Sequence, residues 1–434
     1  MKEDMILTDE MQTVMNLVKN NDDNVFVTGK AGSGKTTFLK YLIAHCGKNC
    51  IVAAPTGVAA INAGGVTLHS LFGIPFGPIT PYDKLENKFS EYKTEMLLKL
   101  QLLIIDEVSM VRPDILDTID RKLRWVCESD EPFGGVQVVM FGDLFQLPPV
   151  IKKQEYKILS DYYDGFFFFN ARVFKRTGFH VIELTKIFRQ TDPEFIGVLN
   201  NIRNYQVTSE ELDMLSELKD KKASANYDGE YIHICTHRAD VEKINTEKLG
   251  DKDLYVFHAN MQGAFPESSV PCDLHLKIRT GARIMALVND SIKGYYNGML
   301  GVVTAIEGDI VKARMDNGLL VKFERYTWSN MQYVLKDDTI TREEIGTCTQ
   351  YPFTLAWAIT IHKSQGLTFD KIVIHIAKTF CPGQLYVALS RCRTLEGIIS
   401  DAYITKQMVI PEYALIDFER AYKSEGNYYG KRFD

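Results

Sequence analysis

The sequence predicts an α/β protein with two α/β units in series and a small β-barrel inserted into the second unit. Short apolar runs alternate with helical stretches over most of the chain, as a parallel sheet requires. One internal segment is different, because it consists of several short β-rich runs in succession. We expect the first unit at residues 1–180, the second at residues 181–282 and 350–434, and the barrel at residues 283–349.

The strands of both units are predicted from apolar runs. In the first unit most are continuous, which is typical of parallel strands buried on both faces. There Phe38, Leu39, Leu42 and Ile43 repeat at helical spacing directly after a Gly-rich loop, so a helix follows the first strand. The predicted strands are residues 24–28, 51–54, 102–105 and 136–141 in the first unit, and residues 231–235, 354–359 and 371–376 in the second.

The barrel segment contains the runs RIMALV, GMLGVVTAI, IVKARM and LLVKFERYTW. Asp316, Asn317 and Gly318 lie between two of them and predict a tight hairpin turn.

Composition places the chain among ordinary globular proteins. Of 434 residues, 45% are hydrophobic and 24% charged, and no apolar run reaches the roughly 18 residues of a membrane span. The acidic start MKEDMILTDE and eight Cys residues without a C-x-x-C pair predict an intracellular protein, cytoplasmic or in the nucleoid if bacterial. A net charge of −6 does not by itself indicate nucleic-acid binding, although a narrow groove can be locally positive.

A nucleotide site is predicted at residues 29–36, where GKAGSGKT fits G-x-x-x-x-G-K-[ST]. Backbone N–H groups of such a loop hold phosphates, Lys35 reaches the β- and γ-phosphate oxygens, and the Thr36 hydroxyl binds Mg²⁺. The alternative is a Gly-rich turn with an incidental Lys, which the order strand, loop, helix disfavours. The expected nucleotide-binding residues here are Gly32, Ser33, Gly34, Lys35, Thr36 and Thr37.

The run LLIIDEVSM at residues 102–110 places two acids at the end of a buried strand. We expect Asp106 to hold the Mg²⁺ together with Thr36, and Glu107 to polarise the attacking water as general base. The alternative is a strand that ends in a solvated acidic turn. Together with the P-loop, the pair indicates an ATPase, a GTPase or a kinase, and nothing in either motif specifies work on nucleic acid.

Six further motifs resemble those of superfamily-one helicases, in the same order. The match is closest to the PIF (petite integration frequency) family, which is related to the RecD-like five-prime-to-three-prime branch, and it extends from about residue 12 to residue 393. Residues 114–135, from DILDTIDRKLR to PFGG, look like that family's own signature. The motifs are APTGVAA (54–60), TLHSLF (67–72), FGDLFQLPPV (141–150), LTKIFRQ (184–190), TLAWAITIHKSQGLTFD (354–370) and GQLYVALSRCR (383–393).

The resemblance implies two RecA-like P-loop domains in tandem, a Src-homology-like barrel, and an ATP-dependent DNA helicase that uses ATP and Mg²⁺. It identifies Gln12 as the adenine-reading residue, although Met11 stands beside it where the family more often has Glu. Gln146 would sense the γ-phosphate, and Arg189 and Arg391 would act on it as arginine fingers in cis. The alternative for each arginine is a surface or interdomain ion pair.

The resemblance also assigns a path for single-stranded DNA. A lone His such as His69 is more often structural, and the family match is what favours DNA contact here. Residues 72–81 contain three Pro and two Gly, so they should project as a stiff loop. The family counterpart is a wedge-like insertion that meets the duplex at the fork, and the alternative is an ordinary surface loop. The expected DNA-binding residues are Thr56, His69, Phe72, Thr360, His362, Lys363 and Ser364.

The implied partners are single-stranded DNA and forked or tailed duplex DNA, with roles in DNA repair, recombination and telomere maintenance in the family. The sequence leaves open whether forks, G-quadruplexes or RNA–DNA hybrids are preferred. One rival function is a DNA-stimulated translocase that strips proteins with little unwinding, and another is a non-catalytic nucleotide switch. His233, Cys235 and His237 alternate, but core packing is favoured over zinc because no fourth ligand is near. For residues 166–169, buried packing between domains is favoured over a stacking platform.

Overall fold

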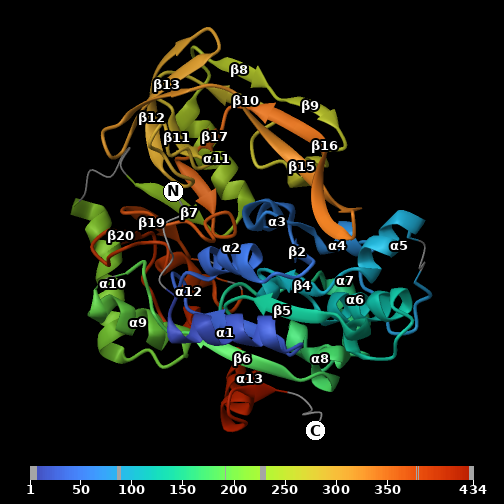
Figure 1. The fold of residues 1–434 in the computed structure, drawn as a ribbon. Coiled ribbons are helices and arrows are strands. Elements are labelled where there is room, and N and C mark those ends of the chain that lie inside the picture. The colour runs from blue at the N-terminus through green and yellow to red at the C-terminus, as the bar shows by residue number, and fades with distance from the viewer. Residues whose placement is uncertain are drawn as a thin grey trace. The chain divides into compact units, whose positions relative to one another are not determined.

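The computed structural model describes residues 7–85, 89–190, 192–224, 231–377, 379 and 381–429 (Figure 1). The chain divides into two compact units. Unit 1 comprises Met1–Phe188, Met331–Glu343 and Glu412–Asp434, and unit 2 comprises Arg189–Asn330 and Glu344–Pro411.

Unit 1 contains a seven-stranded sheet with the order β21-β6-β1-β5-β4-β2-β3. The pairs from β6 to β3 are parallel, and β21 adds an antiparallel edge. All four strands predicted for the first unit are present. The strands are β1 (Asn24–Gly29), β2 (Cys50–Ala54), β3 (Val66–Thr67), β4 (Leu102–Ile105), β5 (Gln137–Phe141), β6 (Phe179–Leu184) and β21 (Tyr428–Tyr429).

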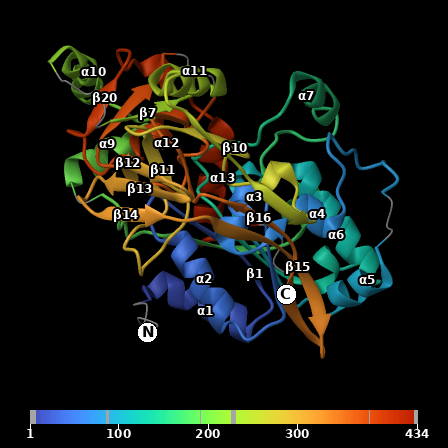
Figure 2. The same ribbon diagram turned by 90° about the horizontal axis from the view of Figure 1, so that it is seen from above.

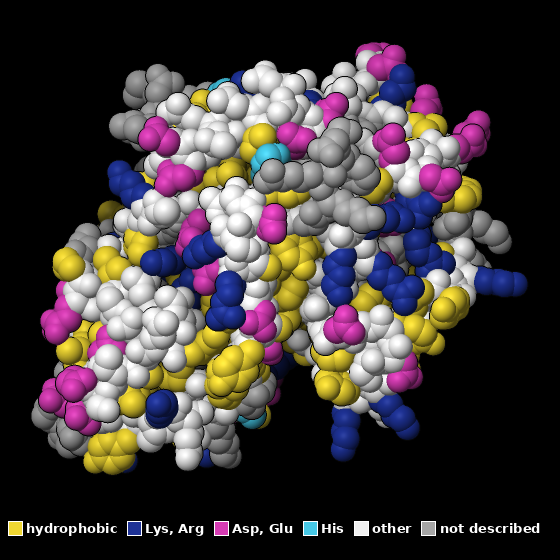
Figure 3. Space-filling model, turned by 90° about the horizontal axis from the view of Figure 1, so that it is seen from below, with side chains coloured by type: hydrophobic (Ala, Val, Ile, Leu, Met, Phe, Trp, Pro, Cys, Tyr) yellow, Lys and Arg dark blue, Asp and Glu magenta, His cyan; other side chains and the backbone are white. Residues whose placement is uncertain are grey.

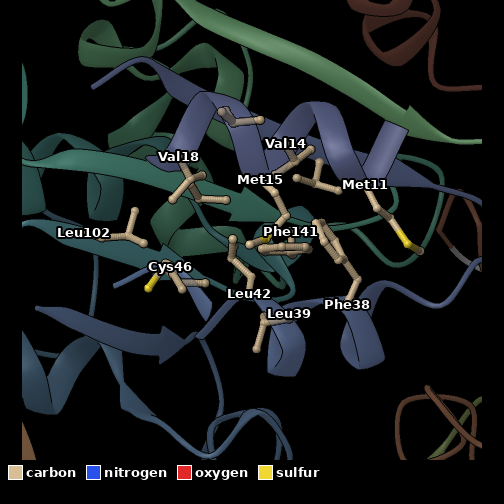
Figure 4. Close-up of a cluster of buried hydrophobic side chains, with 14 of the residues drawn as sticks. Met11, Val14, Met15, Val18, Phe38, Leu39, Leu42, Cys46, Leu102 and Phe141 are labelled. Atoms are coloured by element: carbon tan, nitrogen blue, oxygen red, sulfur yellow. The ribbon is translucent and has the colours of Figure 1, made fainter. Parts of the chain in front are cut away.

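The first helix shows how this sheet is covered. Met11, Val14, Met15 and Val18 recur at helical spacing and are buried, and the Thr8 side chain caps the helix by accepting from the Met11 N–H. Figure 4 shows these side chains pointing from α1 toward those of α2. The helices of unit 1 are α1 (Asp9–Asn20), α2 (Lys35–His45), α3 (Gly57–Ala63), α4 (Leu68–Phe72), α5 (Glu91–Leu98), α6 (Pro113–Val126), α7 (Lys153–Leu159), α8 (Arg172–Arg176) and α13 (Tyr413–Ser424).

Two boundaries differ from the prediction. Strand β6, expected to open the second unit, pairs with β1 over its whole length and so belongs to the first sheet. The C-terminal helix α13, also expected in the second unit, lies in unit 1, where the Phe418 ring stacks on Phe169 at 4.3 Å. Phe167, Phe168 and Phe169 are therefore buried as predicted, but inside one unit rather than between two.

Unit 2 contains a four-stranded parallel sheet with the order β18-β7-β19-β20. The strand predicted at residues 354–359 is in fact two strands in two different sheets, β17 and β18. The elements are β7 (Ile232–Cys235), β18 (Ala358–Thr360), β19 (Ile372–His375), β20 (Ile398–Ser400), α9 (Pro193–Arg203), α10 (Ser209–Ser224), α11 (Arg238–Leu249) and α12 (Gln384–Leu389).

The predicted barrel segment supplies most of a five-stranded antiparallel sheet with the order β14-β13-β12-β11-β17. The predicted turn at Asp316–Gly318 joins β13 to β14, and Gly318 takes the positive φ of 86° that this turn needs. In this order β14 and β17 are the two edge strands, so closure of the sheet into a barrel stays a prediction. The strands are β11 (Arg283–Ala286), β12 (Leu300–Glu307), β13 (Ile310–Met315), β14 (Leu320–Phe323) and β17 (Phe353–Leu355).

A long hairpin formed by β15 (Tyr326–Lys336) and β16 (Thr339–Gln350) follows β14 (Figure 2). Its tip belongs to unit 1, where the Tyr333 hydroxyl accepts from the Val52 N–H. In the described part of the chain, no helix is long and apolar enough to span a membrane. The remaining elements are β8 (Tyr255–His258), β9 (Asn260–Gly263), β10 (His275–Ile278) and the 3₁₀ turns Val108–Met110, Pro132–Gly135, Phe168–Asn170, Glu267–Ser269 and Lys406–Met408.

Candidate functional site

The Gly-rich loop of unit 1 runs from the end of β1 into the first residue of α2. Gly32 and Gly34 have φ values of 82° and 83°, which only glycine adopts without strain. The Lys35 ammonium lies across the loop and donates to the Gly29 carbonyl at 2.6 Å and to the Lys30 carbonyl at 3.1 Å. The loop is therefore closed around the lysine, with the helix N-terminus beside it, which is a geometry that suits phosphate binding.

Ser33 gives an independent test of whether phosphate fits this loop. Its side chain is 1% exposed, and its Oγ is buried with no hydrogen-bond partner. A buried hydroxyl in that state costs free energy unless a ligand satisfies it. Thr36 and Thr37, in the first turn of α2, are exposed. The predicted nucleotide residues thus include one unsatisfied donor and two accessible hydroxyls.

The predicted acidic pair lies at the carboxyl end of β4, which is separated from β1 by the single strand β5. Asp106 is 8% exposed; burial raises the pKa of its carboxyl, and the positive charge of Lys35 lowers it in part. Its Oδ1 accepts from the Glu107 N–H at 2.9 Å. Glu107 has a φ of 51°, a strained backbone for a residue with a side chain and one that is typical of functional sites. Lys35 and Asp106 are therefore close enough in unit 1 for their charges to interact, and their roles in binding phosphate and Mg²⁺ stay predictions.

Gln146 follows β5, the strand between β1 and β4. Its side chain is 8% exposed and its Nε2 donates to the Asp143 carboxylate at 3.2 Å. Asp143 is itself fully buried and also accepts from the Phe145 N–H. Gln146 is thus held at the same edge of the sheet as Lys35 and Asp106.

The predicted adenine-reading residue is accompanied by an aromatic ring that the sequence analysis missed. Gln12 is exposed on α1, and its Nε2 donates to the Leu7 carbonyl at 3.3 Å. Phe188 donates its N–H to the Gly32 carbonyl at 2.9 Å, and its ring lies where a side chain on Gly34 would touch it at 3.5 Å. Half of Phe188 is exposed, and the Lys186 ammonium lies 5.0 Å from the ring. The sequence contains one signal for this residue, an aromatic side chain between Lys186 and Arg189 in the motif LTKIFRQ.

Arg189 is the first arginine of unit 2. Its guanidinium donates to the Ser390 and Gly366 carbonyls, both at 3.2 Å. Burial lowers its pKa to about 10, and the nearby Arg393 also lowers it. The group is therefore still a cation at neutral pH.

Arg391 is 1% exposed within unit 2. Its guanidinium donates to the Val387 carbonyl at 2.9 Å, the Ser364 carbonyl at 3.1 Å and the Ser390 hydroxyl at 2.8 Å. These bonds tie α12 to the loop after β18, a structural function that the sequence analysis did not consider. The role of Arg391 as a finger stays a prediction.

The strand-binding residues predicted in unit 1 lie on short helices after β2 and β3. The exposed Thr56 caps α3 through its Oγ1, which accepts from the Ala59 N–H at 3.2 Å. Burial lowers the pKa of the half-buried His69, and its ring stacks on Phe76 with a centroid distance of 5.1 Å. The prediction for Phe72 is wrong, because that side chain is 0% exposed and packs in the core. Phe76, 90% exposed, is the accessible aromatic of this loop.

The loop at residues 72–81 is anchored to α6. The buried Asp114 carboxylate accepts from the Ile79 N–H at 3.0 Å and pairs with Arg112 at 2.7 Å. Arg112 in turn donates to the Gly77 carbonyl at 2.5 Å. Arg112 and Asp114 therefore hold the second half of this loop in place, while Phe76 before it is exposed.

In unit 2 the predicted strand-binding residues lie in the turn after β18. Thr360 Oγ1 accepts from the Lys363 N–H at 3.1 Å, Lys363 is exposed, and burial lowers the pKa of His362. Ser364 is 0% exposed and donates to the Ile361 carbonyl at 2.7 Å. Its predicted DNA contact through the hydroxyl is thus wrong.

Metal binding was considered at two places. The expected Mg²⁺ ligands, the Thr36 hydroxyl and Asp106, fit an ion that keeps several waters and binds nucleotide phosphates. Among the described residues, no group of three or more His, Cys, Asp or Glu side chains could hold a metal. The ring nitrogens of His233 and His375 lie 2.7 Å apart, Cys235 is buried and His237 is exposed.

Comparison with known proteins identifies relatives over the whole chain. Residues 6–213 match the family model described as PIF1-like helicase. The chain is 34% identical over 404 residues to the ATP-dependent DNA helicase PIF1 of Danio rerio, covering 90% of this chain and 60% of that protein. The chain therefore spans about three fifths of the length of that curated relative.

Two solved structures are more similar. The structure of Bacteroides sp Pif1 in complex with ADP-AlF4 is 80% identical, covers 99% of this chain and 100% of its own, and has a TM-score of 0.95. Pif1 helicase from Bacteroides in complex with ADP-AlF3 and ssDNA is also 80% identical with the same coverage, and has a TM-score of 0.74.

Proposed function

The chain belongs to the family of PIF1-like helicases, and on this premise we propose that it is an ATP-dependent DNA helicase that moves along single-stranded DNA and unwinds duplex. The observation that carries the proposal is the meeting of Lys35, Asp106 and Gln146 at one edge of the sheet in unit 1. Solved structures of an 80% identical helicase contain ADP-AlF4 in one case, and ADP-AlF3 with ssDNA in another, which supports both ligands here.

For ATP hydrolysis we assign one task to each residue. Lys35 and the loop N–H groups bind the phosphates, and Glu107 accepts a proton from the attacking water. Thr36 and Asp106 would hold Mg²⁺, which would supply positive charge at the phosphate oxygens. Gln146 is positioned to detect the γ-phosphate, and Gln12 and Phe188 to contact the adenine.

Unit 2 contributes cations and a strand-binding turn in this proposal. Arg189 and Arg391 would place positive charge on the γ-phosphate as charge develops there. Thr360, His362 and Lys363 would contact the phosphates of the strand, which fixes register without reading sequence. We further propose that both units are RecA-like and that the antiparallel strands of unit 2 form a small barrel.

In unit 1, Thr56 and His69 would contact the strand, and Phe76 would meet the terminal base pair of the duplex. The proposed substrates are single-stranded DNA and forked or tailed duplexes, with G-quadruplexes and RNA–DNA hybrids as further candidates. Movement from 5′ to 3′ and an intracellular location, in the cytoplasm or nucleoid if the source is bacterial, complete the proposal.

Strand displacement on tailed duplexes of both polarities tests the proposal. Unwinding that needs ATP and a 5′ tail, together with ATPase activity stimulated by single strands, is the expected result. Strong ATPase stimulation with hardly any displacement would instead indicate a translocase that removes bound proteins. Hydrolysis that ignores DNA would indicate a general P-loop ATPase.

A further inference from the structure

Helix α6 of unit 1 has one face that the nucleotide and strand-binding residues do not use. Most of the helix is buried, but Arg121, Arg124 and Trp125 are spaced to share one side, and Glu128 follows just after the helix ends. They line an open hollow of about 670 Å³, within the usual size range of ligand sites. Its lining consists of Lys84, Leu85, Arg121, Arg124, Trp125, Glu128, Ser129 and Asp130, and we call it the α6 hollow.

Trp125 is the apolar part of the hollow. The chain has three Trp residues, of which Trp328 and Trp357 are 5% and 8% exposed, whereas Trp125 is 46% exposed. Its ring lies 6.3 Å from that of Phe89, so it is backed on one side and open on the other. A large ring in this state is a suitable surface for a second flat ring to stack on.

Two lysine side chains lie beside Phe89, the ring that contacts Trp125. The Lys93 and Lys122 ammonium groups lie 5.2 Å and 5.0 Å from the Phe89 ring. Burial lowers the pKa of both lysines. Repulsion by a neighbouring cation lowers each pKa further, with Lys122 as the neighbour of Lys93 and Arg121 as the neighbour of Lys122.

The acids of the hollow offset only part of this charge. Asp130 pairs with Arg124 at 2.5 Å, and Glu128 is the other carboxylate of the lining. Arg121 donates to the Asp83 carbonyl at 2.7 Å and the Thr80 carbonyl at 3.4 Å, which are neutral acceptors. The lining contains three cations and two carboxylates, an excess of one positive charge, and Arg124 also lies 3.9 Å from the Asp120 carboxylate. Figure 3 shows one face of the molecule, on which Lys and Arg side chains lie among Asp and Glu side chains.

The bonds of Arg121 also locate the hollow. Thr80 lies within the projecting loop at residues 72–81, so the hollow begins where that loop returns to α6. Phe76, at the tip of the same loop, stacks on His69. If Phe76 meets the junction of a fork, the hollow lies where the loop returns from that junction to α6.

We propose that the α6 hollow binds the displaced single strand at a fork, with a base stacked on Trp125 and its phosphates beside Lys84 and Arg121. This inference rests on the proposed function. Stacking rings combined with cations are the usual means of binding single strands without sequence preference. An acidic peptide would use the cations but would leave the Trp125 face without a stacking partner.

Tryptophan fluorescence tests the contact directly, because Trp125 is the exposed one of the three. Without nucleotide, a forked duplex with two unpaired arms should quench the emission, and a duplex with only the tracked tail should not. Trp125→Phe should abolish the quenching, and Trp357→Phe, which alters a buried ring, should retain it. Equal quenching by both DNAs, or none, would overturn the proposal. Quenching by an Asp/Glu-rich peptide with a C-terminal Phe, but not by the fork, would assign the hollow to a protein partner.

A kinetic test uses the double variant Lys84→Glu/Trp125→Ala. Its affinity for the displaced arm should fall by about tenfold or more, the scale of one lost base stack. We expect the parent to unwind a fork faster than a tailed duplex, and the double variant to unwind both at the same rate. Stimulation of the ATPase by single strands should be the same in both proteins. The control Tyr413→Ala removes another exposed ring of unit 1, 68% exposed, and should keep the advantage. A parent without stimulated ATPase would sink the proposed function, whereas an unchanged fork advantage in the double variant would sink only this inference.

Discussion

The exposed tip of the loop at residues 72–81 allows unwinding to be separated from movement. Phe76 is 90% exposed, whereas Ile74 and Ile79 on either side of it are 5% and 4% exposed. Replacing the loop would remove both buried isoleucines, at about 2–5 kcal/mol each, from a total stability of about 5–15 kcal/mol. Phe76→Ala removes the tip and leaves these anchors, so it is the sharper perturbation.

The expected size follows from what Phe76 would replace. Opening one base pair forfeits about 1.4 kcal/mol of stacking, and a ring that stacks on the end of the duplex offsets part of it. Full loss of that compensation corresponds to about a tenfold lower unwinding rate. The ATPase rate on single strands should not change, because Phe76 lies outside every nucleotide-binding motif.

A stopped-flow unwinding assay on a forked duplex, run beside an ATPase assay on single strands, measures both quantities. Tyr82→Ala is the matched control, since Tyr82 is 78% exposed and lies just beyond the same loop. Selective loss of unwinding in Phe76→Ala is the expected result. If Phe76→Ala and Tyr82→Ala both unwind at the parental rate, the loop does not act at the fork.

Three further predictions concern the nucleotide. Lys35→Ala should abolish ATP hydrolysis, because it removes the cation at the phosphates. Glu107→Gln should keep nucleotide binding and lose turnover. If both variants lose the same affinity for a fluorescent nucleotide, the role assigned to Glu107 is wrong. Arg391→Ala should lower kcat by on the order of 10³ with a smaller change in KM, and a fall in Tm with turnover intact would leave Arg391 only its structural bonds. Phe188→Ala should raise the KM for ATP by about tenfold, the scale of a lost stacking contact, and Phe188→Tyr should restore it; an unchanged KM in Phe188→Ala would exclude adenine contact.

The first sheet was predictable because its signals are local. A continuous apolar run such as residues 102–105 can be buried on both faces only in a covered parallel sheet, and the P-loop pattern needs a strand before it and a helix after it. The split of residues 354–359 into β17 and β18 had no such signal. Ala356 and Trp357 between them are also buried, so hydrophobicity is unbroken where the chain changes sheets. The Asn245 side chain, far away in sequence, bonds both the N–H and the carbonyl of Ala358.

Exposure was the least predictable property of the candidate site. Phe72 and Phe76 are four residues apart in a Pro-rich loop, and only packing decides that one is 0% and the other 90% exposed. Ser364 has the same difficulty, since a hydroxyl in a strand-binding motif can serve DNA or the backbone. Its donation to the Ile361 carbonyl depends on the turn geometry after β18, which no sequence pattern specifies.

The bonds of unit 2 connect the proposed phosphate sensors to the strand-binding turn. Arg391 donates to the carbonyl of Ser364, and Arg189 donates to the carbonyl of Gly366, so both arginines hold the turn that carries His362 and Lys363. An N–H that turns from one of these carbonyls to a phosphate oxygen no longer holds the turn, because one N–H has one best acceptor direction. Release of the turn changes where His362 and Lys363 can meet a strand. If the two arginines bind a γ-phosphate and the turn binds DNA, as proposed, these two hydrogen bonds would couple nucleotide binding to the grip on the strand.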